Sequence, residues 1–224
     1  MPFNKEALQA AIASVHRAYM SSATAVRTGG VISPLHEYCA AELRAGGLPT
    51  EYIHPPAERR TRSPRRLRIL GGYMPKEIDV CLIPPNSGPL LAISVKSQMS
   101  SIVKNTINRF EEYVGDATNL HTRFPMLVLG FLMLVPVANE TFAGGKPTAG
   151  LTRIASLLER ANARQKVNEP PGSYEASALL LVDFTSEPPR VVTTFPNPRA
   201  QAALRIETFF DRLVTIYHER NQFV

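Results

Sequence analysis

Cysteine is scarce in this sequence, which has only two, Cys39 and Cys81, among 224 residues. Their separation matches no metal-ligand spacing, and two residues do not make the disulfide framework of a small secreted domain. We therefore expect both cysteines to be small buried residues of a protein in a reducing compartment.

Long hydrophobic runs are also missing. The most apolar stretch, Phe124–Val137, has 14 residues and is interrupted by Pro125, Gly130 and Pro136. A bilayer-spanning helix needs roughly 20 apolar residues, so this stretch is expected to form a buried strand. The opening segment, MPFNKEALQA, lacks the apolar core of a signal peptide. Together these absences predict a cytoplasmic protein with no membrane partner.

Acidic residues are too few to balance the basic ones: 19 Asp and Glu stand against 25 Lys and Arg, a formal net charge of +6. The excess lies in one stretch, Arg59–Arg68, which has six arginines and no acid. Cations so close together repel one another unless an anion joins them, which favours nucleic acid as a partner, with a membrane surface second. The alternative is a solvated loop without a ligand. The candidate DNA-binding arginines are Arg59, Arg60, Arg62, Arg65, Arg66 and Arg68.

The overall composition, 44% hydrophobic and 20% charged, is that of a globular chain long enough for one sizeable core. We expect a single domain over 1–224, with an Arg-rich loop at about 55–75 and a catalytic core at about 76–137. Periodicity and turn signals predict an α/β fold, a mixed central sheet flanked by helices. The first half of the chain is expected to form a helix with Leu8, Ile12, Val15 and Tyr19 on its apolar side, a helix from Ser33 to about Gly46, and strands Glu77–Ile83 and Leu90–Gln98. A helix with an apolar stripe at Val103, Ile107, Phe110, Val114 and Ala117 should follow. The rest of the chain is expected to form strand Met126–Val135, helix Leu151–Lys166, strands Ala176–Phe184 and Val191–Phe195, and helix Ala200–Glu219.

Charged residues fall on two neighbouring predicted strands. Alternation along the second strand places Ser94, Lys96 and Gln98 on one face and only apolar residues on the other, and Asp79 lies on the strand before it. One interpretation is a cross-strand salt bridge at a solvated edge, worth less than about 1 kcal/mol. The other is a site for phosphodiester hydrolysis, which needs a hard cation on oxygen ligands and a group that orients and helps deprotonate water. Asp79 would then be the ligand, and Lys96 would position the water.

This pattern resembles the core of the PD-(D/E)XK nucleases: Asp79, fourteen intervening residues, then SVK at 94–96. The extension KSQ at 96–98, followed by KNTINRFEEYVGDATNL, is similar to XhoI-like type II restriction endonucleases, where such a strand leads into a helix with Asn-Arg-x-Glu-Glu. The resemblance covers residues 79–120. It implies a restriction-endonuclease-like core, Mg²⁺-dependent cleavage of double-stranded DNA at a specific sequence, a homodimer that cuts both strands of a symmetric target, and a cognate DNA methyltransferase encoded nearby.

Ser94 stands where the family's acid-x-Lys motif has Asp or Glu. Some restriction enzymes of the superfamily share this serine and take the missing carboxylate from the next helix, where this chain has Glu111 and Glu112. At 100° per residue, Glu111 lies about 80° from the predicted apolar stripe and Glu112 about 180° from it. We therefore expect Glu111 to face the sheet and Glu112 to face solvent. Ser94 is expected to touch a metal-bound water, not to act as a nucleophile.

A third acid is expected from the helix that begins at Ser33. Glu37 is at the position that the resemblance implies, with Glu42 as a competing choice and an exposed helix acid as the alternative to both. The expected catalytic residues are therefore Asp79, Lys96, Glu111, Ser94 and Glu37, with Mg²⁺ held by Asp79, Glu111 and Glu37.

Three amides, Gln98, Asn105 and Asn108, are candidate contacts to DNA bases or phosphates, and capping of the helix start is the alternative. Two other function classes stay open. One is a nuclease-fold protein that binds DNA without cutting because Ser94 replaces the acid. The other is a basic structural protein that binds RNA or a membrane, which would leave the pattern of acid and lysine unexplained.

Overall fold

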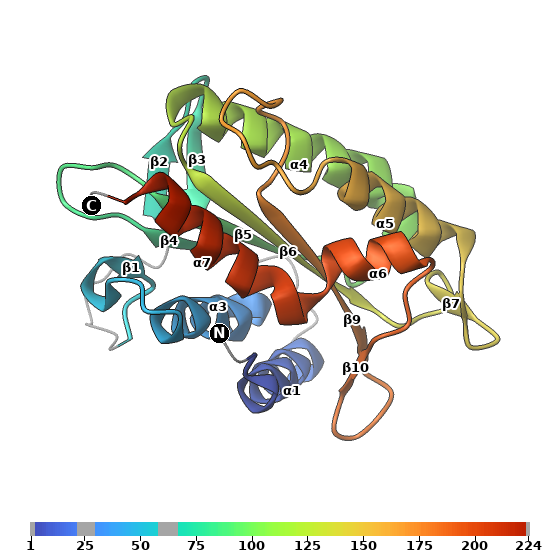
Figure 1. Ribbon diagram of the computed structural model, residues 1–224. Helices are drawn as coiled ribbons and strands as arrows, with labels where there is room; N and C mark the ends of the chain where they lie inside the picture. Colours follow the sequence, from blue (N-terminus) through green and yellow to red (C-terminus); the bar gives the residue numbers. More distant parts are fainter. Residues whose placement is uncertain (1–2, 22–29, 58–66, 223–224) are drawn as a thin grey trace.

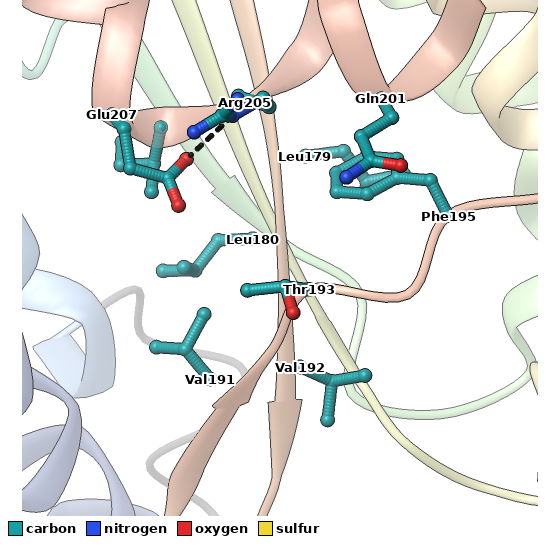
Figure 2. A pocket seen from close by; sticks show the side chains of 10 residues that line it. Leu179, Leu180, Val191, Val192, Thr193, Phe195, Gln201, Arg205 and Glu207 are labelled. Atoms are coloured by element: carbon teal, nitrogen blue, oxygen red, sulfur yellow. Dashed lines mark hydrogen bonds and ion pairs between the residues drawn. The ribbon is translucent and has the colours of Figure 1, made fainter. Parts of the chain in front are cut away.

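A computed structural model describes residues 3–21, 30–57 and 67–222 of the chain. Its centre is a six-stranded mixed sheet in the order β1-β4-β5-β6-β9-β10 (Figure 1). The parallel strands are β5 (Leu91–Ser97), β6 (Val128–Pro136) and β9 (Ala176–Asp183), and those antiparallel to their neighbours are β1 (Ile53–His54), β4 (Val80–Leu82) and β10 (Arg190–Val192). A helix lies in each connection between parallel strands, as such crossovers require. The prediction of an α/β fold with a mixed central sheet is confirmed.

Helices cover both faces of this sheet (Figure 1). On one face lie α1 (Lys5–Ser21), α3 (Ser33–Ala45) and α7 (Phe209–Arg220), and on the other lie α4 (Ile102–Arg123), α5 (Ala149–Arg160) and α6 (Pro198–Leu204). The period of two along β5 sends Leu91, Ile93 and Val95 into the core under α3, whereas Ala92 enters the core under α4. The helices predicted at the first two places in the chain are both present.

A separate hairpin, β2 (Leu67–Leu70) with β3 (Pro75–Ile78), precedes β4 in the chain. A single residue, Asp79, separates β3 from β4 and lies in a bend. The expected continuous strand over 77–83 is therefore interrupted. Because the bend breaks the alternation, Ile78 and Cys81 both enter the core under α4, while Val80 enters the core under α3.

Two predicted helices differ from the observed ones. The helix expected to reach Lys166 ends at Arg160, because Ala163 has a φ of 65° and Arg164 turns inward to the buried Glu175. The last predicted helix is divided at Arg205, which is extended (φ −71°, ψ 134°). Four short elements complete the description: η1 (Gly30–Ile32), η2 (Thr50–Tyr52), η3 (Ile206–Thr208) and the hairpin β7 (Phe142–Ala143) with β8 (Lys146–Pro147).

Cys39 and Cys81 are buried and free, as expected of small core residues. Over the described residues, no helix combines the length and the apolarity that crossing a membrane requires.

Candidate functional site

Strand β5 presents two polar side chains on the face of the sheet that α4 covers. Ser94 and Lys96 are half-buried, whereas Val95 between them is buried in the opposite core. In the parallel pairing with β6, Ser94 lies beside Phe131 and Lys96 beside Met133, and both of these partners belong to the core under α4. The predicted alternation along β5 is confirmed.

Asp79 is hydrogen-bonded to the backbone of β5 at Val95, between Ser94 and Lys96. Its Oδ2 accepts a hydrogen bond from the Val95 backbone N–H at 2.9 Å. Regular pairing of β4 with β5 stops next to the bend, so the carboxylate takes the position that a backbone carbonyl would hold in a continued ladder. On its other side, Asp79 Oδ1 lies 3.7 Å from His36 Nε2 of α3. Asp79 therefore connects α3 to β5 at the residue between the two polar side chains of that strand.

Helix α4 contributes Glu112, and not Glu111, to the same face. Lys96 Nζ lies 3.1 Å from Glu112 Oε1, and Arg109 donates a hydrogen bond of 2.5 Å to Glu112 Oε2. Glu111 is exposed. The prediction that Glu111 faces the sheet and Glu112 faces solvent is wrong.

The error comes from the choice of the apolar stripe on α4. Val103 and Ile107 of the predicted stripe are 41% and 37% exposed. The buried side of the helix runs instead through Thr106, Tyr113 and Ala117. Because each residue advances the helix by 100°, a stripe displaced by one position turns the following glutamate toward the sheet.

Alternating charges extend from β5 across α4 to β3. Lys76 Nζ lies 2.5 Å from Asp116 Oδ2 and 3.9 Å from Glu112 Oε1. Burial opposes ionisation of Glu112, but Lys96 and Arg109 outweigh it and hold the pKa of this carboxyl below its usual range. At Asp116 burial prevails over the nearby Lys76 and raises the pKa of the carboxyl. Glu112 and Asp116 therefore differ in how readily each carboxyl group ionises.

Three carboxylates act on one buried phenol. The pKa of Tyr174 is held well above its ordinary value, first by burial and then by the negative charges of Asp116, Glu112 and Asp79. Asp79 lies in the bend before β4, and Glu112 and Asp116 lie on α4.

Helix α3 presents a histidine to Asp79, and not the glutamate that was expected. Glu37 is exposed. Glu42 is only 3% exposed, and burial raises its pKa. No sequence motif pointed to His36. Its position three residues before the buried Cys39 was the available signal, since residues three apart share a helix face.

The predicted DNA-binding amides have different surroundings. Gln98 is buried, with Oε1 accepting from Arg109 Nε at 3.0 Å and Nε2 donating to the Ser100 carbonyl at 2.5 Å. It therefore positions Arg109, the partner of the α4 carboxylate. Asn105 is half-buried and Asn108 is exposed on α4. Of the six candidate arginines, Arg68 is exposed on β2. Those outside the described residues are Arg59, Arg60, Arg62, Arg65 and Arg66.

The acids near β5 can be tested against the needs of Mg²⁺. No group of three or more His, Cys, Asp or Glu side chains able to hold a metal ion occurs in the described part of the chain. Mg²⁺ is commonly bound through one or two carboxylates, with waters and substrate phosphates completing its octahedron. Asp79 and Glu112, which contact the consecutive residues Val95 and Lys96, are the two carboxylates to consider for a site of that kind.

Comparison of the chain with protein-family models, with curated proteins and with solved structures gives no significant match.

Proposed function

We propose that the protein is a Mg²⁺-dependent endonuclease that cleaves double-stranded DNA. The observation that carries this proposal is the hydrogen bond from the Val95 N–H to Asp79, which holds a carboxylate at the strand position between the half-buried residues Ser94 and Lys96. The resemblance to PD-(D/E)XK nucleases implies an acid and a lysine on neighbouring strands, and Asp79 and Lys96 are those two residues in this sequence. A cross-strand salt bridge is the simpler explanation of such a pair, but Lys96 pairs with Glu112 of α4.

Each residue of the proposed site would have its own role. Asp79 and Glu112 supply hard oxygen ligands for Mg²⁺, which when bound neutralises the phosphate and makes its coordinated water more acidic. Lys96 orients the attacking water and stabilises negative charge on the phosphate. Glu112 holds Lys96 on the face of the sheet that also bears Ser94, so one side chain serves both the metal and the lysine.

The surroundings of Glu112 prepare it for this role. A metal ligand must be deprotonated, and although burial opposes ionisation of Glu112, Lys96 and Arg109 lower its pKa and so favour the deprotonated form. Gln98 holds Arg109, which in turn fixes the second oxygen of Glu112. Ser94 is small enough to leave room for a water beside Lys96, and its hydroxyl can hydrogen-bond that water.

The finer parts of the proposal follow from the resemblance. A type II restriction enzyme cuts both strands of a symmetric site, which needs two copies of the catalytic centre and hence a homodimer. It also implies a DNA methyltransferase that protects the host sequence. Positive charge for the DNA backbone is available at Arg68 and, in the sequence, throughout Arg59–Arg68.

A second candidate is a DNA-binding protein with this fold that does not cut. It is favoured by the way both Glu112 oxygens are engaged, one by Lys96 and one by Arg109, and by the serine at position 94. If these ion pairs persist when DNA binds, Glu112 is not released to a metal, and Asp79 remains as a single carboxylate.

The two candidates are separated by digestion of unmethylated plasmid and phage DNA with the purified protein. We expect Mg²⁺-dependent cleavage that stops in EDTA and in the Lys96→Ala variant, with Lys104→Ala as the matched control because Lys104 is an exposed lysine of the same helix that bears Glu112. Discrete fragments would also establish sequence specificity. Salt-sensitive DNA binding without cleavage would establish the second candidate, and cleavage that survives Lys96→Ala would refute the assignment of residues.

A further inference from the structure

The turn of the β2–β3 hairpin exposes large apolar side chains. Leu70 is 52% exposed, Tyr73 is 72% exposed and Met74 is 61% exposed. These three residues lie within five consecutive positions, whereas the other large apolar residues with high exposure are distributed over several elements. A concentrated exposed patch of this kind is typical of a contact surface, since scattered single residues are the ordinary case.

Helix α4 holds this turn in one conformation. Asn119 Oδ1 accepts from the backbone N–H groups of Tyr73 and Met74 at 2.9 and 3.1 Å, and its Nδ2 donates to the Met74 carbonyl at 3.0 Å. The two glycines of the turn allow the close approach: a Cβ at Gly71 would lie 2.4 Å from the Asn119 side chain, and one at Gly72 would lie 2.6 Å from Thr122. The apolar side chains are therefore displayed on a preorganised backbone.

The outer face of the hairpin combines these apolar residues with one arginine and one glutamate. The register pairs Arg68 with Glu77 and Leu70 with Pro75, and all four are exposed, while Ile69 on the inner face is buried under α4. Figure 1 shows the hairpin outside the main sheet, beside one end of α4. Arg68 thus stands two residues from Leu70 on the same exposed face of β2.

The turn is linked directly to the proposed active site. Strand β3 connects Met74 to Asp79, and the five residue steps between them span at most about 17 Å in an extended chain. On the way, Lys76 reaches Asp116 and Glu112. A spacing of about 17 Å corresponds to about five base pairs of DNA, so a duplex with a phosphate near Asp79 would have bases within reach of the turn.

We infer that the β2–β3 turn is a wedge that contacts DNA bases, with Tyr73 stacking on a base, Met74 and Leu70 entering between base pairs, and Arg68 binding the adjacent phosphate. This inference rests on the proposed function, because it takes duplex DNA as the ligand of the molecule. The inference adds to the proposed function that binding alone unstacks the DNA bases locally, before any strand is cut. Exposed Leu, Met and aromatic side chains are the residue types that unstack base steps, and Arg68 matches the phosphate charge.

The test uses the full-length protein and duplexes that carry 2-aminopurine at successive positions, in EDTA so that no strand is cut. Because 2-aminopurine fluoresces more strongly when unstacked, we expect wild-type binding to raise the fluorescence at one or a few positions. Tyr73→Ala and Met74→Ala should each remove the rise, and Tyr73→Ala should weaken binding by about 5- to 140-fold, the range of base stacking on aromatic side chains. Tyr73→Phe should retain the rise because the ring is kept.

The matched control is Met126→Ala, a methionine that is 47% exposed in the turn between α4 and β6. It should bind and unstack DNA as the wild type does, and circular dichroism would show that all variants are folded. DNA binding with no rise, or a rise that persists in both alanine variants, would overturn the wedge and leave the nuclease proposal intact. No DNA binding at all would overturn both. Binding to anionic lipid vesicles that depends on Tyr73, without DNA binding, would assign the turn to a membrane and likewise overturn the inference.

Discussion

Replacement of Glu175 by glutamine should destabilise the fold more than any other single change of charge in its surroundings. Its side chain is fully buried directly before β9, and Oε1 lies 2.6 Å from Arg164 Nη1 and 2.7 Å from Arg220 Nη1. Its Oε2 accepts from the Leu129 N–H at 2.8 Å and lies 3.4 Å from His121 Nε2. These partners come from α4, β6, α7 and the segment after α5, so one carboxylate joins four parts of the chain.

The size of the effect follows from the charges left behind. Glutamine keeps the shape and can still accept from Leu129, but it leaves the Arg164 and Arg220 guanidinium groups, 1% and 6% exposed, without a counter-ion. Breaking a buried ion pair in this way costs about 3–5 kcal/mol. An unfolding entropy of about 2.1 cal/mol/K per residue gives about 0.5 kcal/mol/K for this chain, so Tm should fall by about 6–11 °C.

The assay is thermal unfolding at pH 7 followed by circular dichroism, with Glu111→Gln as the control. Glu111 is exposed, and its substitution should change the free energy of unfolding by no more than about 0.5 kcal/mol. A fall in Tm of less than about 2 °C for Glu175→Gln would refute the reasoning, because it would mean that the two guanidinium groups reach water or other acceptors without cost.

Two further predictions concern stability. Burial raises the pKa of Glu42 in the folded state, so its contribution to stability is complete below the ordinary glutamate pKa and is lost as pH rises through the raised value. The Tm of Glu42→Gln relative to wild type should therefore increase between pH 4 and pH 8, and a constant difference in Tm across that range would contradict it. Asn119→Ala removes three hydrogen bonds to the β2–β3 turn and should lower the free energy of unfolding by about 1–3 kcal/mol in urea titrations. The exposed Asn108 of the same helix is the matched control, and equal stability of the two alanine variants would count against a turn fixed by Asn119.

The arrangement of β5 could be predicted because its apolar residues obey a strict period of two. A half-buried strand that separates two cores shows this pattern directly in the sequence, and Ser94 and Lys96 lie on the expected face. The buried face of α4 could not be found in the same way. It includes Thr106, whose hydroxyl donates to the Ile102 carbonyl, and Tyr113, whose hydroxyl donates to the Ala161 carbonyl. Polar side chains with satisfied hydrogen bonds count as exposed in a hydrophobicity pattern, which moved the predicted stripe by one residue.

Features that depend on distant residues had no local signal. Asp79 bends the chain because its carboxylate bonds to a backbone N–H sixteen residues away. Helix α5 ends early because Arg164 reaches a glutamate on the next strand. Neither interaction can be read from periodicity, since each joins segments that meet only in the folded chain. Which glutamate of α4 faces β5 likewise depends on a contact between distant residues, that of Glu112 with Lys96.

The most direct test of the account compares Glu112→Gln with Glu111→Gln in Mg²⁺-dependent cleavage of unmethylated plasmid DNA. The two residues are adjacent on α4, but only Glu112 contacts Lys96. The account predicts that Glu112→Gln abolishes cleavage while DNA binding persists, and that Glu111→Gln cuts as the wild type does. Cleavage that survives Glu112→Gln, or that is lost only in Glu111→Gln, would contradict the assignment of Asp79, Lys96 and Glu112 as the catalytic group.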